Sequence, residues 1–170
     1  MIEFLILYEL NKKVLTMYGV SKEIHNDFSV LTTPSYGTIK PALTRMCNSG
    51  FIKFQKTMSP GGRPSTYYSI TKEGIGELKN LLLAPVQDNP IQFLTDSRIR
   101  LACSDVLEPQ QQKELFRMLR LKSESIMLDT KNRLETGKMN YLSKMVFDNL
   151  VCEYKNFISL LEGFERAGNN

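Results

Sequence analysis

The feature that most limits what this chain can fold into is a stretch without acidic residues, from Pro34 to Lys72. Its pattern changes from a short amphipathic helix to a run of β-branched and aromatic residues, and a Pro-Gly-Gly-Arg-Pro break leads into a second such run. No acidic residue lies between Asp27 and Glu73, but six basic ones do: Lys40, Arg45, Lys53, Lys56, Arg63 and Lys72. A helix and a hairpin with charge of one sign are typical of a surface that meets a phosphate backbone. The stretch therefore predicts a winged helix-turn-helix that binds DNA.

The net charge of +4 lies entirely in the N-terminal half of the 170-residue chain. Residues 1–83 contain ten Lys and Arg against six Asp and Glu, whereas residues 84–170 contain twelve of each kind. This division indicates one part that faces a polyanion and a neutral part that is structural or self-associating. A half-domain with this excess also arises by chance, so the charge alone does not decide the function.

The sequence offers little support for a metal, a cofactor or an enzyme. Cys47, Cys103 and Cys152 form no C-x-x-C pair, and His25 is the single histidine. This argues against a zinc site or a disulfide framework and predicts reduced cysteines in a cytoplasmic protein. No nucleophile motif, phosphate-binding G-x-x-x-x-G-K loop or obvious carboxylate pair points to catalysis. No apolar run reaches the ~20 residues that a membrane span requires, and the apolar start lacks the features of a signal peptide.

The helix predicted at about residues 35–48 carries the candidate DNA-reading surface. With Ile39 as the core direction, Ala42, Leu43 and Met46 fall on its side at about 100° per residue. The opposite side is small, polar and basic, which suits insertion into the major groove. An ordinary solvated helix face is the alternative. The DNA contacts expected from this segment are Ser35, Tyr36, Thr38, Lys40, Thr44 and Arg45.

A β-hairpin is predicted after this helix, with its tip at about residues 60–65. Gly61-Gly62 allows a tight reversal between the two apolar and aromatic runs. Arg63 at the tip can follow a phosphate or enter a minor groove, and Lys56 adds attraction for phosphates. A plain hairpin with one surface arginine is the alternative.

The order of these segments resembles the PadR family of transcriptional regulators over roughly residues 2–83. The residues that carry the resemblance are Gly37-Thr38, Pro41-Ala42-Leu43, Gly50, Gly62-Arg63-Pro64, Tyr68, Thr71 and Gly74. It implies a dimeric winged-helix repressor, with residues 34–48 as the recognition helix and residues 60–65 as the wing. Lys40 stands where the family usually has an aromatic residue, and Ser65 and Thr66 stand where it is usually basic. We infer that a basic contact has moved from the wing to the helix.

The second half of the chain is expected to be a helical dimerisation domain, so that residues 1–83 and 84–170 form two domains. Its final helix has apolar residues at spacings of three or four and others outside that stripe. Because such a helix must be covered on more than one side, a partner chain is favoured, with burial in a helical bundle as the alternative. The candidate dimer contacts are Leu142, Val146, Leu150, Tyr154, Phe157 and Leu161. Other helices are predicted at about residues 2–10, 19–28, 72–83, 91–103, 109–136 and 138–167.

The expected fold is therefore mainly α with a small β-hairpin wing. The expected function is a homodimeric repressor on double-stranded operator DNA, which could be palindromic. The alternative function is a protein-interaction module whose winged helix no longer reads DNA. Met118, Met127, Met139 and Met145 could line a pocket for a small hydrophobic effector, or they could fill the core. Cys47, at the edge of the recognition helix, is a small buried hydrophobe or, less simply, a redox sensor.

Overall fold

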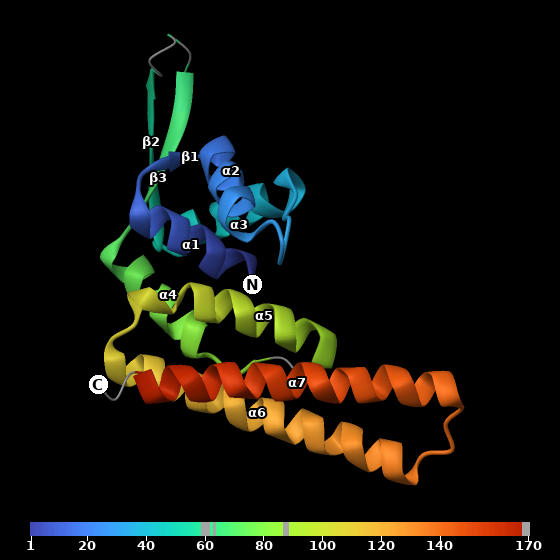
Figure 1. Ribbon diagram of the computed structural model, residues 1–170. Coiled ribbons are helices and arrows are strands. Elements are labelled where there is room, and N and C mark those ends of the chain that lie inside the picture. The colour runs from blue at the N-terminus through green and yellow to red at the C-terminus, as the bar shows by residue number, and fades with distance from the viewer. Residues whose placement is uncertain (59–61, 63, 87–88, 168–170) are drawn as a thin grey trace. The chain divides into compact units, whose positions relative to one another are not determined.

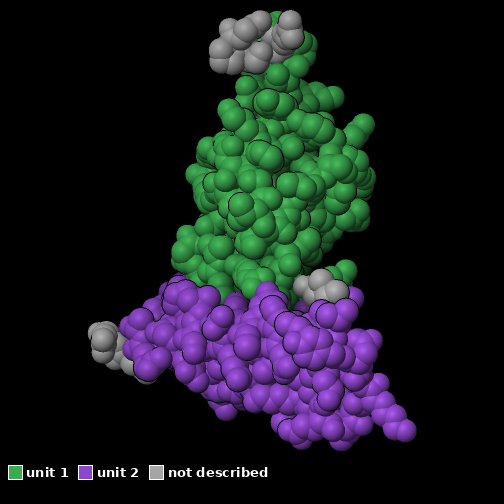
Figure 2. All heavy atoms as spheres, turned by 45° about the vertical axis from the view of Figure 1, so that its right-hand side comes forward, with its two compact units in different colours: residues 1–85, 91–106 green, residues 86–90, 107–170 purple. Residues whose placement is uncertain are grey.

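The chain folds into two compact units, which Figure 2 shows in different colours. Unit 1 contains residues 1–85 and 91–106, and unit 2 contains residues 86–90 and 107–170. The computed structural model describes residues 1–58, 62, 64–86 and 89–167. It is mainly helical with one small sheet, which confirms the predicted fold class.

Unit 1 has the element order of a winged helix, followed by one further helix and a short 3-10 turn at residues 104–106 (Figure 1). The elements are α1 (Ile2–Lys12), β1 (Leu15–Thr16), α2 (Met17–Phe28), α3 (Tyr36–Asn48), β2 (Ile52–Met58), β3 (Pro64–Ile70), α4 (Lys72–Leu83) and α5 (Pro90–Ala102). The five helices among these were all predicted within three residues of their bounds. The strand β1 was not predicted, because two residues carry no recognisable alternation.

Helix α1 lies at the centre of unit 1 and packs against α2, α3 and α4. All of its residues from 4 to 10 are buried, including the fully buried Leu5, Ile6 and Leu7. On α3, the four residues predicted to face the core are at most 2% exposed: Ile39, Ala42, Leu43 and Met46. The apolar side of α3 is therefore held against α1, and the opposite side faces solvent.

Two threonines set the starts of helices α2 and α4. The Thr16 hydroxyl accepts a hydrogen bond from the Gly19 amide at 3.1 Å, so α2 begins two residues earlier than the apolar spacing predicts. The Thr71 hydroxyl accepts in the same way from the Gly74 amide at 3.0 Å, which caps α4. A Cβ at Gly74 would overlap the Phe51 carbonyl, so this close approach requires glycine.

The sheet is antiparallel with the strand order β1-β3-β2. The pairing of β2 with β3 runs without interruption from Ile52 opposite Ile70 to Met58 opposite Pro64, which confirms the predicted hairpin. Strand β1 adds to the other side of β3, with Leu15 opposite Tyr68. At the tip, residues 59–61 and Arg63 lie outside the described residues.

Unit 2 consists mainly of two long helices, α6 (Pro109–Thr136) and α7 (Tyr141–Ala167), which lie side by side (Figure 1). Pro109 occupies the first turn of α6 as expected. Helix α7 starts three residues later than predicted, where the Asn140 side chain accepts a hydrogen bond from the Ser143 amide at 2.9 Å. Arg120 of α6 donates to Glu165 of α7 at 2.9 Å, which ties the two helices together.

Candidate nucleic-acid interface

Helix α3 presents its polar side to solvent, as the sequence predicts. Tyr36, Thr38, Lys40, Thr44 and Arg45 are all exposed. The Thr44 hydroxyl donates to the Lys40 carbonyl at 3.2 Å, and its lone pairs remain available to a ligand. This side is polar and basic and so has the composition that a major-groove surface requires.

The Ser35 side chain behaves differently from a helix cap. Ser35 is the residue before α3, but its hydroxyl makes no hydrogen bond to a helix amide. It instead pairs with the Thr38 hydroxyl at 3.2 Å. The amides of the first turn of α3 are therefore not occupied by the Ser35 side chain, and the two hydroxyls form a small exposed polar pair.

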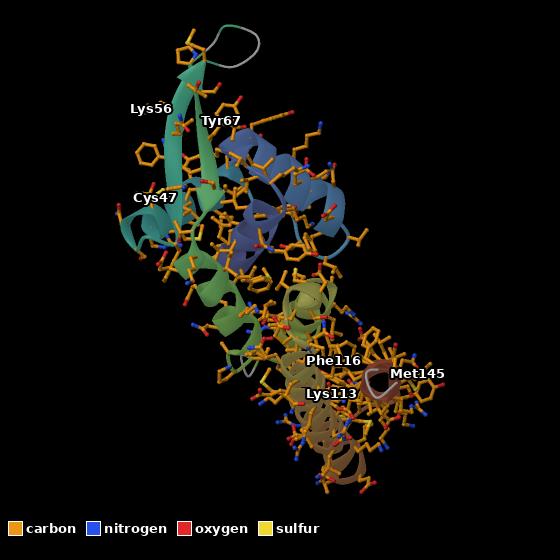
Figure 3. The ribbon with its side chains drawn as sticks, turned by 90° about the vertical axis from the view of Figure 1, so that its left-hand side faces the viewer. Cys47, Lys56, Tyr67, Lys113, Phe116 and Met145 are labelled. Atoms are coloured by element: carbon orange, nitrogen blue, oxygen red, sulfur yellow. The ribbon has the colours of Figure 1, made fainter. Side chains whose placement is uncertain are left out.

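A hollow of about 380 Å³ lies where α2, α3 and β3 meet. Its lining residues are Thr16, Met17, Tyr18, Lys40, Ser65, Thr66 and Tyr68. Lys56 of β2, labelled in Figure 3, is the cross-strand partner of the lining residue Thr66. Neither Asp nor Glu belongs to the lining, and Lys40 has no carboxylate partner among the described residues. Lys40 of the helix thus lines the hollow, and Lys56 of the hairpin is paired with one of its lining residues; we call these two lysines the basic region of unit 1.

A second hollow, of about 250 Å³, lies between α2 and the start of α3. Its lining residues are Tyr18, Ser21, Lys22, His25, Thr33, Pro34 and Tyr36. Tyr18 lines both hollows and is largely exposed. Sequence reasoning missed Tyr18 and Lys22, although they occupy the side of α2 that Val20 and Ile24 leave free. Spacing the residues of α2 at 100° per residue, as for α3, puts both on the side away from the core.

Arg45 lies at the other flank of α3 and contacts an acidic residue. Its Nε and Nη2 donate to Oε1 of Glu3 on α1 at 3.0 and 2.8 Å. The segment without acidic residues is therefore not free of carboxylates in space, since α1 supplies one. Whether Arg45 reads DNA, as the sequence suggests, depends on opening this ion pair.

The thiol of Cys47 is half-buried beside the sheet (Figure 3). Burial raises the pKa of Cys47, which disfavours the reactive thiolate. Among the described residues, no cluster of three or more His, Cys, Asp or Glu side chains is placed to hold a metal ion. In the same part of the chain, no helix has the length and apolar character to cross a membrane.

The six candidate dimer residues of α7 fall into different environments. Leu142 and Val146 are 71% and 67% exposed, and Leu150 is half-buried. Tyr154, Phe157 and Leu161 are instead buried inside the chain, and the Tyr154 hydroxyl donates to the Pro90 carbonyl at 3.1 Å. This differs from the expectation that all six face a second chain, because α7 also has to supply the core of its own unit.

Part of the chain matches a known protein family. Residues 6–80 match the model of the transcriptional regulator PadR-like family. A PadR family transcription regulator from Clostridium difficile R20291 is 32% identical over 46% of this chain and 79% of its own, with a TM-score of 0.40. No curated protein is similar enough to count as a match.

Two solved structures of Bacillus subtilis PadR are similar over nearly the whole chain. The complex with operator DNA is 21% identical, covers 98% of each chain and has a TM-score of 0.45. The complex with p-coumaric acid is 20% identical, covers 99% of this chain and 98% of the other, and has a TM-score of 0.43. The chain belongs to the PadR-like family of transcriptional regulators, and it is a DNA-binding regulator rather than an enzyme.

Proposed function

We propose that the chain is a homodimeric repressor whose helix α3 enters the major groove of operator DNA. The observation that carries this proposal is the hollow between α2, α3 and β3, where Lys40 lies beside the lysine-bearing hairpin without a lining carboxylate. Thr38 and Thr44 would meet base edges or phosphates, and Lys40 and Lys56 would neutralise phosphates. The wing tip with Arg63 would contact the backbone or the minor groove.

The exposed apolar side of α7 supports the proposed homodimer. Tyr141, Leu142, Met145 and Val146 are each more than half exposed, and a second chain would cover them. Two-fold symmetry would then place two α3 helices in half-sites roughly 34–36 Å apart, which calls for a palindromic operator. In this scheme residues 1–83 bind DNA, and residues 84–170 contain the dimer contacts.

A small hydrophobic effector and a cytoplasmic location complete the proposal. Bacillus subtilis PadR has been crystallised with p-coumaric acid. A molecule of that kind, an aromatic ring with a carboxylate, would bind in unit 2, where methionines such as Met118 offer a half-buried thioether that packs readily against rings. A regulator of transcription acts where the DNA is, which in a bacterial cell is the cytoplasm.

The most informative experiment is footprinting on the DNA immediately upstream of this protein's own coding region, at two salt concentrations. We expect protection of two half-sites about one helical turn apart, with weaker protection at the higher salt concentration. The Lys40→Ala variant should give the same protection only at a protein concentration about fivefold higher or more. Lys155→Ala, which removes one positive charge from α7, should give it at the wild-type concentration.

Absence of any salt-dependent DNA binding would contradict the proposal. If the protein then still formed stable dimers or complexes with other proteins, the alternative of an interaction module without DNA reading would stand instead.

A further inference from the structure

Glu3 of α1 forms an ion pair with Arg45, the only arginine of α3. Both hydrogen bonds from the Arg45 guanidinium end on the same oxygen, Oε1 of Glu3, at 3.0 and 2.8 Å. The two residues are 42 positions apart in sequence and meet because α1 packs against α3. Lys40, on the opposite flank of α3, forms no such pair within the described part of the chain. The two cations that flank the exposed side of α3 are thus in different electrostatic states.

The ion pair is exposed enough to exchange partners. The Arg45 and Glu3 side chains are 58% and 38% exposed, and pairs of this kind contribute little to folding. Opening the pair therefore leaves the fold intact. A DNA phosphate offers the planar guanidinium an equivalent set of acceptor oxygens. The same two N–H groups cannot serve Glu3 and a phosphate at once, so the carboxylate and the DNA are competitors.

We infer that Glu3 competes with DNA phosphates for Arg45 and thereby weakens sequence-independent binding to duplex DNA. The inference rests on the proposed function, since α3 must approach DNA for the competition to occur. An arginine that is neutralised by a carboxylate releases no counterions from the duplex, so it adds nothing to the salt-dependent part of the affinity. Glu3 is then a residue that favours specific sites by suppressing one contact that every DNA sequence offers.

The test measures binding to a short duplex of random sequence by fluorescence anisotropy over a range of salt concentrations. Glu3→Gln should bind about threefold to fivefold more tightly than the wild type at low salt. The slope of log K against log salt should become steeper by about 0.9. Arg45→Ala should remove the whole gain in the Glu3→Gln background and change little in the wild-type background. Glu77→Gln on α4 is the matched control, because it alters the net charge equally and its carboxylate contacts Asn80 rather than an arginine.

Three results would overturn the inference while the wild type still binds DNA. The first is equal affinity of the wild type and Glu3→Gln for the random duplex. The second is a gain in affinity that persists when Arg45→Ala is added to Glu3→Gln, or that Glu77→Gln also produces. The third is a large loss of affinity when Arg45→Ala is made in the wild type. Thermal unfolding of each variant in the same buffers shows whether a change in binding reflects a change in folding. A wild type that binds no duplex at any salt concentration would overturn the proposed function and this inference with it.

Discussion

The two units differ in how completely each buries its own apolar side chains. In unit 1, α1 is enclosed by its neighbours, and α3 buries its core side while it exposes a polar and basic one. In unit 2, α7 buries Tyr154 and Leu161 but leaves its N-terminal turns, with Leu142 and Val146, uncovered. A unit that closes its own core can offer a polar surface to DNA. A helix pair with an uncovered apolar side instead calls for a second protein chain.

The largest effect is expected from charge placed on the uncovered apolar side of α7, because this tests directly whether a second chain covers it. Leu142→Asp together with Val146→Asp should weaken dimerisation by about 3–5 kcal/mol, because an interface would bury carboxylates without partners. Sedimentation equilibrium measures this as a shift from dimer to monomer. Ser159→Asp, at another exposed position of α7, is the control. A double variant that stays dimeric would show that the dimer forms elsewhere.

Substitutions in the buried part of α7 should instead lower the stability of the folded chain. Leu161→Ala removes a fully buried side chain from unit 2 and should lower the free energy of unfolding by about 2–5 kcal/mol. Denaturant unfolding at a protein concentration far above the dimer dissociation constant separates this effect from dissociation. Little loss of stability, combined with loss of the dimer, would place Leu161 in the interface as the sequence had suggested.

The basic region of unit 1 should affect DNA binding without affecting stability. Lys40→Ala and Lys56→Ala should each make the slope of log K against log salt shallower by about 0.9, because each removes one phosphate contact. Anisotropy titrations over several salt concentrations measure the slope. If Lys155→Ala of α7 changed the slope as much as either variant, the proposal that unit 1 rather than unit 2 contacts DNA would be contradicted.

The smallest effect is expected from a buried carboxylate in unit 1. Glu9 is fully buried, its Oε2 has no hydrogen-bond partner among the described residues, and Lys12 donates to its Oε1 at 3.2 Å. Burial raises the pKa of Glu9 above its ordinary value in spite of Lys12. The folded state therefore favours the protonated form, and the stability associated with Glu9 is lost as the pH rises through its raised pKa.

Glu9→Gln should consequently stabilise unit 1 slightly at neutral pH. The gain should shrink as the pH falls toward the ordinary carboxylate pKa, because the wild-type side chain then becomes neutral as well. Thermal unfolding of both proteins at several pH values measures the difference. A variant that is less stable at neutral pH would show that the contact between Glu9 and Lys12 outweighs the cost of burial.

The sequence predicted α3 and the hairpin well because their patterns leave few choices. On α3 the apolar residues occupy a single side, so the core direction and the exposed side follow directly. Lys40 and Lys56 are both exposed, and their contact with DNA stays a prediction. The early start of α2 depends on a hydrogen bond from the Gly19 amide to Thr16, which spacing alone does not reveal.

The remaining features depend on packing between distant segments. Helix α7 has apolar residues on more than one side, and the sequence does not tell which side meets α6 and which remains open. This is why Tyr154, Phe157 and Leu161 were grouped with Leu142 and Val146. The pair of Arg45 with Glu3 joins residues that come together only when α1 packs against α3. Charge counted along the sequence cannot detect such a contact.

Hydrogen–deuterium exchange of the full chain, with and without the duplex protected in the footprint, tests the central claim most directly. We predict that DNA slows exchange in residues 36–48 and in the strands 52–58 and 64–70, while residues 109–167 remain unchanged. Slower exchange confined to residues 109–167, with none in α3 or the hairpin, would contradict the account.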